Sequence, residues 1–314
     1  MCIRDRQELD RRLMAEPLFV SLHAKFSFDL DGGGTRFSHE SDDLALRAFL
    51  DHGLPKFQFL FAGHDTGFAV SPEHAVDCLL EAARVCIQLA HQFAVPVRSK
   101  KILGIPGAFE SLMQAVAHLL QKSAAHGANM VDPMPLGVYP GRSADHVNVI
   151  PSVPLGRLTG AQALCLAEAA KKCGSDLRLA CWRGVVLGAV PLSERDELVA
   201  QLQAVGLPCD NRDGFRGVAA CAGSHGCDAS LADVRRDAAL LASHLAGYNT
   251  PAGWTVNFSG CEKQCAMRFE ASAHLVANPL GYSLRLPGNV QATQFLHEAT
   301  PHVLQRVVFE AASK

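Results

Sequence analysis

The chain has 314 residues, of which 48% are hydrophobic and 19% charged, and its formal net charge is −2 at pH 7. This composition is typical of a globular protein and excludes a disordered chain, and without a basic excess nucleic acid is not expected as a partner. No apolar run approaches the ~18–20 residues that cross a bilayer, and the charged N-terminus lacks the apolar centre of a signal peptide. We therefore expect a cytoplasmic protein with no membrane partner.

The first part of the chain alternates between strand and helix signals. Residues 20–31 alternate as in a strand and end in a glycine-rich turn, and residues 57–70 predict two strands around a tight turn. Ser71 and Pro72 are typical of a helix start, which predicts a helix that continues to about Phe93. A second amphipathic helix is predicted over residues 106–125.

A Pro- and Gly-rich stretch at residues 130–154 is the best candidate for a domain boundary. After it, residues 159–174 predict a helix with a capping box at Thr159 and Gln162 and a glycine at its end. A strand over 177–187 and a helix that Ser193 caps and Gly206 ends follow. This order of elements resembles half of a ferredoxin-like α/β sandwich.

The last hundred residues begin with a Gly-rich loop at Gly214. The pattern then predicts a helix over 230–246, strands at 254–258, 272–277 and 282–286, and a C-terminal helical region with a break at Pro301.

Eleven cysteines are many for a chain without secretion signals, and they fall into three groups. Helical spacing predicts four of them as core residues: Cys78, Cys86, Cys165 and Cys173. Cys2, Cys181 and Cys209 stand alone. The remaining four form two close pairs.

The two pairs are Cys221 with Cys227 and Cys261 with Cys265, in a C-x5-C and C-x3-C arrangement. Four thiolates can hold a [4Fe–4S] cluster or a tetrahedral zinc ion. The five-residue gap is long for a zinc knuckle, and glycines beside each pair let backbone amides approach the sulfur atoms. The spacing favours an iron–sulfur cluster over zinc and over unligated structural cysteines.

With residues 257–261 ahead of the second pair, this arrangement resembles the sulfite/nitrite reductase superfamily, in which four thiolates hold a [4Fe–4S] cluster beside a tetrapyrrole. Within that superfamily the chain most resembles the precorrin-3B synthase family. The segments that carry this second resemblance are residues 24–28 with 31–33, 154–159, 177–179 with 182–187, 219–221 and 232–238.

The resemblance implies an α+β fold with two nitrite/sulfite reductase [4Fe–4S]-type domains and a ferredoxin-like half-domain. The expected divisions are an unassigned leader at 1–16, a first reductase-like α/β domain at 17–145, the half-domain at 146–210 and the iron–sulfur domain at 211–314. Members of the family start with a further half-domain, so we expect the chain to be truncated at its N-terminus, with a sheet edge and apolar surface exposed.

The activity implied by the resemblance is an O₂-dependent monooxygenation in aerobic cobalamin biosynthesis, in which precorrin-3A is hydroxylated at carbon 20 and a γ-lactone forms. The cluster would relay electrons from an external, NADH-linked reductase, because the chain shows no nucleotide-binding motif. One alternative is a siroheme-dependent sulfite or nitrite reductase that uses the same four cysteines. Another is an inactive, truncated iron–sulfur protein.

A tetrapyrrole carries several carboxylates, and its site needs cations to pair with them. Each candidate also has the simpler interpretation of a solvated surface charge. The candidates are Arg183, Arg178, Lys25, Arg142 and Lys263. For His225 the two interpretations are a hydrogen-bond donor near the cluster and an exposed loop histidine.

Overall fold

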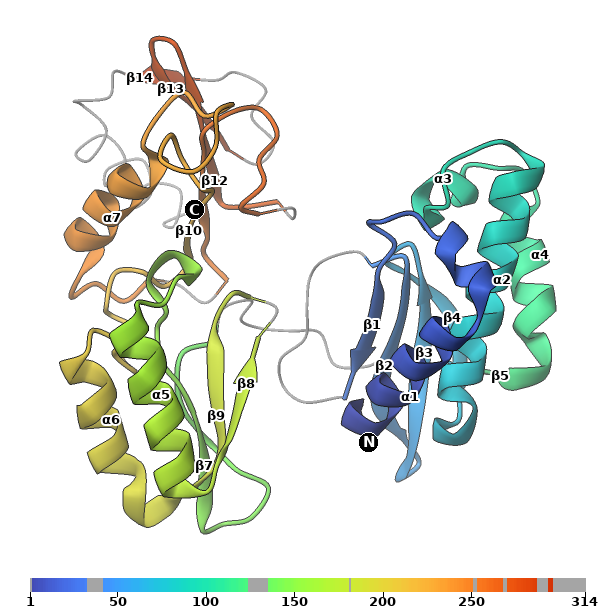
Figure 1. Cartoon of the computed structure of the whole chain (residues 1–314), viewed down its shortest axis with the longest axis horizontal. Coiled ribbons are helices and arrows are strands. Elements are labelled where there is room, and N and C mark those ends of the chain that lie inside the picture. The colour runs from blue at the N-terminus through green and yellow to red at the C-terminus, as the bar shows by residue number, and fades with distance from the viewer. Residues whose placement is uncertain are drawn as a thin grey trace. The chain divides into compact units, whose positions relative to one another are not determined.

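The computed structural model describes residues 2–32, 42–123, 135–180, 182–250, 253–267, 270–286 and 293–295. The chain divides into two compact units, residues 1–130 and 131–314, and each is described by itself (Figure 1). Among the described residues, no helix has the length and apolar character to cross a membrane. The finer domain divisions expected from the resemblance stay predictions.

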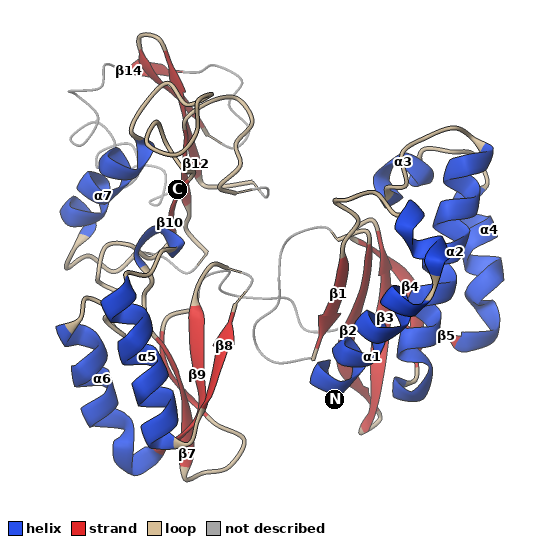
Figure 2. Cartoon of the chain, viewed as in Figure 1, coloured by secondary structure: helices blue, strands red, loops and turns tan. Residues whose placement is uncertain are grey.

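The first unit is a five-stranded sheet covered by helices (Figure 2). The sheet has the order β1-β2-β3-β4-β5, with β1 parallel to β2 and the other pairs antiparallel. Its strands are β1 (Phe28–Asp31), β2 (Leu44–Asp51), β3 (Leu54–Phe61), β4 (His64–Val70) and β5 (Leu120–Lys122). Its helices are α1 (Cys2–Ala15), α2 (Ala75–Gln92), α3 (Ser99–Leu103) and α4 (Ala108–Val116).

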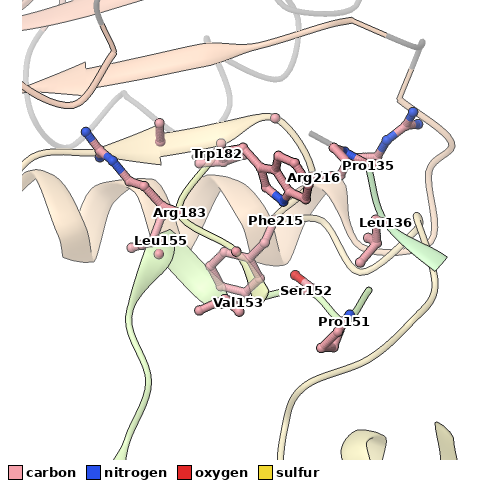
Figure 3. A pocket seen from close by; sticks show the side chains of 15 residues that line it. Pro135, Leu136, Pro151, Ser152, Val153, Leu155, Trp182, Arg183, Phe215 and Arg216 are labelled. Atoms are coloured by element: carbon pink, nitrogen blue, oxygen red, sulfur yellow. The ribbon is translucent and has the colours of Figure 1, made fainter. Parts of the chain in front are cut away.

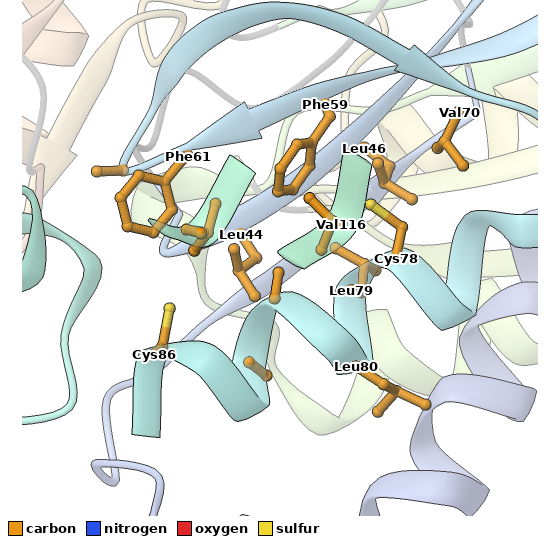
Figure 4. Close-up of a cluster of buried hydrophobic side chains, with 14 of the residues drawn as sticks. Leu44, Leu46, Phe59, Phe61, Val70, Cys78, Leu79, Leu80, Cys86 and Val116 are labelled. Carbon is orange, nitrogen blue, oxygen red and sulfur yellow. The ribbon is translucent and has the colours of Figure 1, made fainter. Parts of the chain in front are cut away.

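Helix α2 supplies much of this unit's core. Cys78 and Cys86 are fully buried, as their helical spacing predicts, and they lie among the side chains of β2 and β3 (Figure 4). Burial raises the pKa of each of these two thiols to about 12. They therefore act as small apolar side chains and not as thiolate ligands.

Asp43 joins three segments of the first unit and is only 1% exposed. Its carboxylate accepts hydrogen bonds from the backbone and hydroxyl of Ser99 (2.7 and 2.9 Å), from Arg98 Nε (3.1 Å) and from the backbone of Ser27 (3.0 Å). Burial alone would raise the pKa of Asp43, but these hydrogen bonds outweigh it and lower that pKa. Asp43 thereby fixes the approaches to β1, β2 and α3.

Two predictions for this unit need correction. The strand predicted over 20–31 is confined to β1, because Pro17 begins a 3-10 helix over Pro17–Ser21. The helix predicted over 106–125 ends at Val116, and the chain then pairs with β4 as strand β5. Helix α1 and strand β2 were not predicted. Gly33 and Gly34 of the predicted turn lie outside the described residues.

The second unit begins with an antiparallel sheet of order β6-β7-β9-β8 and two helices. The strands are β6 (Gly137–Pro140), β7 (His146–Ile150), β8 (Asp176–Leu179) and β9 (Val185–Pro191), and the helices are α5 (Gly160–Cys173) and α6 (Arg195–Ala204). In Figure 1, α5 and α6 lie together on one side of this sheet. This order of elements confirms the ferredoxin-like half-domain.

Local signals hold well in the half-domain. Thr159 and Gln162 form the predicted capping box, and Gly174 ends α5 with a left-handed backbone (φ 59°). Two details differ. The strand predicted over 177–187 is the hairpin of β8 and β9, and Ser193 forms no side-chain cap because a 3-10 turn precedes α6.

Strand β8 is an edge strand whose four residues are all exposed, with Leu179 at 86%. Cys165 and Cys173, which were predicted as core residues, are only half-buried and pack against the margin of this core.

The second sheet of this unit has the order β10-β11-β12-β13-β14. Its strands are β10 (Val218–Ala220), β11 (Val256–Ser259), β12 (Ala273–Asn278), β13 (Gly281–Arg285) and β14 (Thr293–Phe295), and helix α7 (Val234–Leu245) packs against it. The helix predicted over 230–246 begins only at Val234, with Asp233 as its N-cap, and ends at Leu245. The three strands β10, β11 and β12 are parallel to one another. The predicted C-terminal helical region, including Pro301, lies outside the described residues.

Candidate functional site

The two cysteine loops begin at the same edge of the second sheet. Cys221 directly follows β10, and Cys261 follows β11 after one glycine. Because β10 and β11 are adjacent and parallel, their carboxyl ends open toward the same edge. The backbone N–H of Cys221 donates to Phe258 O (3.1 Å), which fixes the first loop against the end of β11.

A backbone amide of the second loop also reaches the first cysteine's sulfur. The N–H of Gly260 donates to Cys221 Sγ at 3.3 Å, across 39 residues of sequence. Amide donors of this kind stabilise a thiolate and tune a bound iron–sulfur cluster. Four thiols on two such loops are the donor set that a [4Fe–4S] cluster takes, so the residues fit that group.

The other two cysteines of the set are more exposed. Cys227 and Cys265 are exposed, whereas Cys221 and Cys261 are half-buried. Among the residues that the structure describes, no three His, Cys, Asp or Glu side chains lie close enough to hold a single metal ion. A tetrahedral zinc ion needs four thiolates around one point, whereas each thiolate of a cluster binds a different iron atom at a separate corner.

Gly260 is the residue that lets the two loops approach each other. A Cβ at this position would overlap Ser230 Oγ and lie 2.7 Å from Ser230 Cβ, while Leu231 N–H donates to Gly260 O at 2.8 Å. The first loop therefore passes directly over the backbone of the second.

We expect Gly260→Ala to force these loops apart and to destabilise the second unit by about 1–3 kcal/mol, the usual cost of overpacking. Urea unfolding followed by Trp fluorescence measures this, because Trp182 and Trp254 both lie in the second unit. The matched control is Gly160→Ala at the start of α5, where no atom lies within 4 Å of the added Cβ. Equal stability of the two variants would contradict the prediction. Adding Ser230→Gly to Gly260→Ala should restore the lost stability.

Of the five predicted cations, Arg183 is the one that forms a hydrogen bond to a described residue of a cysteine loop. It lies in the turn between β8 and β9 with a left-handed backbone (φ 62°), and its Nη2 donates to Cys265 O at 3.1 Å. Gly156 approaches this turn closely, since a Cβ there would lie 2.7 Å from Arg183 Cβ. Lys263 is exposed within the second loop itself.

In the part of the second unit that the structure describes, neither Arg178 nor Arg142 forms a hydrogen bond or ion pair with these loops. Arg178 is exposed on β8 and pairs with Asp176 at 2.6 Å. Arg142 is exposed between β6 and β7, and Lys25 is exposed in the first unit. His225 is 79% exposed and faces Asp233 Oδ2 at 3.4 Å, which favours the loop-histidine interpretation.

A pocket of about 60 Å³ lies beside the second sheet within the second unit (Figure 3). Its apolar wall includes Leu155, Trp182 and Phe215, and Arg183 and Arg216 supply positive charge. Ala219 also lines it. Because Ala219 belongs to a buried cluster against which Cys221 packs, the pocket adjoins the first cysteine loop. It is much smaller than the ~300–1,000 Å³ of typical ligand sites, and its volume suits a carboxylate-sized group.

Phe215 and Arg216 were not predicted as site residues. The one local signal is that glycines flank them: Gly214 and Gly217 both have positive φ (85° and 77°), and a Cβ at either would overlap a backbone carbonyl, Ala242 O or Trp254 O. Arg216 is further held by a hydrogen bond to Thr250 O at 2.8 Å.

Comparison with known proteins supports the half-domain. Residues 139–205 match the family described as the nitrite/sulfite reductase ferredoxin-like half domain. This match runs from β6 through α6 and ends before the first cysteine loop.

Curated relatives are similar over longer stretches. A ferredoxin–nitrite reductase of Synechococcus elongatus is 25% identical over 271 residues, which cover 79% of this chain and 52% of the relative. A sulfite reductase (ferredoxin) 2 of Mycolicibacterium paratuberculosis is 30% identical over 133 residues, 40% of this chain and 24% of the relative. The matched part of the chain thus spans about half the length of the first relative and about a quarter of the length of the second.

Among solved structures, the Mycobacterium tuberculosis NirA protein matches 99% of this chain and 64% of its own, with a TM-score of 0.78 and 20% identity. This likeness confirms the α+β fold.

Proposed function

Since this chain is related to the nitrite and sulfite reductases through its ferredoxin-like half-domain and its fold, we propose that it is an oxidoreductase with a [4Fe–4S] cluster and a siroheme. Cys221, Cys227, Cys261 and Cys265 would hold the cluster. The observation that carries the proposal is the hydrogen bond from Gly260 to Cys221 Sγ, because it joins the two cysteine loops through the sulfur atom itself.

The bound groups would supply electron transfer and a site for reducing a small anion, nitrite or sulfite. This chain's own residues would bind and orient. Arg183 would place its guanidinium between the pocket and the second loop, where it can pair with a siroheme carboxylate. Lys263 would add positive charge beside the cysteines, which favours an approaching anion.

Electrons would come from a separate carrier protein. The two relatives are named for ferredoxin, which supports a small iron–sulfur donor, and an NADH-linked reductase is the alternative donor.

A second candidate is a precorrin-3B synthase, which would take precorrin-3A and O₂ as substrates. The observation in its favour is that the segment 182–187, one of those that resemble this family, includes Trp182 and Arg183 of the pocket wall. Under this proposal Arg183 would pair with an acetate or propionate of the macrocycle instead of a siroheme carboxylate.

The deciding experiment is an absorption spectrum with iron and sulfide analysis on protein purified without oxygen. Both proposals require broad thiolate-to-iron absorbance and about four cluster irons per chain, and the reductase adds the siroheme iron to these. Siroheme bands with nitrite or sulfite reduction would establish the reductase, and conversion of added precorrin-3A without siroheme would establish the synthase. An iron-free protein after reconstitution would reject both.

We expect Arg183→Ala to weaken tetrapyrrole binding by about 10- to 100-fold, the effect of losing one charge-assisted hydrogen bond, with the cluster spectrum retained. Titration of the chain with siroheme measures the affinity. Arg178→Ala is the matched control, because Arg178 pairs with Asp176 on an exposed edge strand. Equal affinities of the two variants would show that Arg183 is only a surface charge.

A further inference from the structure

A row of polar side chains crosses the second sheet beneath the second cysteine loop. Strand register aligns Asn257, His274 and Arg285 on β11, β12 and β13, in line with the apolar Ala219 on β10. Ala219 packs against Ala266, Met267 and Ala271, so this loop covers this face of the sheet. The neighbouring positions along the strands, such as Phe258 and Leu275, belong to the core that α7 covers.

The hydrogen bonds of His274 define where its ring proton lies. The backbone N–H of Ala271 donates to His274 Nε2 at 3.0 Å, so Nε2 carries no proton and acts as an acceptor. A neutral imidazole has one protonated nitrogen, which must then be Nδ1. The ring is therefore the Nδ1–H tautomer.

The partner of Nδ1 follows from Asn257, which is fully buried. Its Nδ2 faces His274 Nδ1 at 3.2 Å, which would set two donors against each other, while its Oδ1 has no hydrogen-bond partner among the described residues. Turning the amide by half a rotation exchanges these atoms and lets Nδ1–H donate to Oδ1. This single rotation of the amide gives both His274 Nδ1–H and Asn257 Oδ1 a hydrogen-bond partner.

The surrounding charges keep the ring neutral. Burial lowers the pKa of His274 first, and the neighbouring guanidinium of Arg285 lowers it further, against a smaller opposite effect of Glu270. Arg285 is itself paired with Glu262 of the cysteine loop at 2.8 Å. These are the charged groups that face or adjoin the ring in the described part of the second unit.

We infer that His274, held by Asn257 as the neutral Nδ1–H tautomer, is a positioning residue that anchors the end of the second cysteine loop to the sheet through Ala271. Protonation at Nε2 removes the acceptor for the Ala271 N–H and places a second positive charge beside Arg285. The Ala271 amide is then released from β12. This role goes beyond the proposed function, because it holds with or without iron.

The tautomer is tested on the full-length chain labelled with ¹⁵N-histidine, with His274→Gln to assign the signal. The expected spectrum shows His274 as Nδ1–H, titrating below an ordinary histidine. Asn257→Asp places a carboxylate next to Nδ1–H and should raise the pKa of His274 by about one unit or more. An Nε2–H tautomer, an ordinary titration, or an unchanged titration in Asn257→Asp would overturn the inference.

The anchoring role is tested by amide hydrogen exchange at Ala271. Gln offers an oxygen where Nε2 lies and does not titrate, so His274→Gln should keep the Ala271 amide protected at every pH. The wild-type chain should lose this protection at least tenfold below the pKa of His274, and His274→Leu should lose it throughout. Equal behaviour of the Gln and Leu variants would overturn the role. Neither readout needs iron, so failure here is distinct from failure of the proposed cluster.

Discussion

Cys227→Ala removes the iron–sulfur cluster and lowers the cluster iron from about four atoms per chain to near zero, because a cube needs a ligand for each iron atom. Cys227 is the sharpest position for this test. It is exposed in the first cysteine loop, so its replacement removes a ligand without opening a cavity in the core. Cys261→Ala should have the same effect, with some loss of packing because Cys261 is half-buried.

The measurement is iron and sulfide analysis with an absorption spectrum after anaerobic reconstitution, beside thermal unfolding with and without iron. Metal binding is coupled to folding, so the wild-type chain should be stabilised by the cluster and Cys227→Ala should not. Cys165→Ala is the control, since Cys165 is a half-buried cysteine on α5 outside both loops. Full iron in Cys227→Ala, or equal loss in Cys165→Ala, would show that the ligands are misassigned.

Asp43→Asn destabilises the first unit by about 3 kcal/mol, the scale of breaking a buried, hydrogen-bonded ion pair. In the variant, an NH₂ group replaces one of the two carboxylate oxygens that accept hydrogen bonds from Arg98, Ser99 and Ser27. At least one of these donors then loses its acceptor. The tryptophans lie in the second unit, so their fluorescence should be unchanged. Hydrogen exchange in α2 and β2 is the direct measurement.

The effect of Asp43 depends on pH in a defined direction. Its pKa is lower in the folded chain than in the unfolded chain, where an aspartate titrates near ~3.9. Its stabilisation is therefore fully present above that value and is lost as the pH falls through the folded-state pKa. The difference in the free energy of unfolding between wild type and Asp43→Asn should therefore disappear in acid. A constant gap down to the folded-state pKa, or an equal effect of the exposed control Glu8→Gln, would contradict this account.

Features that depend on neighbouring residues could be predicted from the sequence. The capping box of Thr159 and Gln162, the helix end at Gly174 and the hairpin of β3 and β4 each involve residues a few positions apart. The buried positions of Cys78 and Cys86 followed from helical spacing for the same reason. The strand predicted over 20–31 was wrong outside β1, because no strand that the structure describes pairs with residues 20–27. Strand β2 was missed because its apolar run has no clear period.

The candidate site divides in the same way. The sequence by itself identified four cysteines in two loops and the half-domain before them, because loop spacing and element order are written along the chain. Only the tertiary structure distinguished the roles of Arg183 and Arg178. Arg183 donates a hydrogen bond to Cys265, 82 residues further along the chain, whereas Arg178 forms an ion pair with the nearby Asp176. It alone placed Gly260 against Cys221. Such contacts are decided by which strands lie side by side and in which register, and that follows from burying the sheet as a whole, not from any one segment.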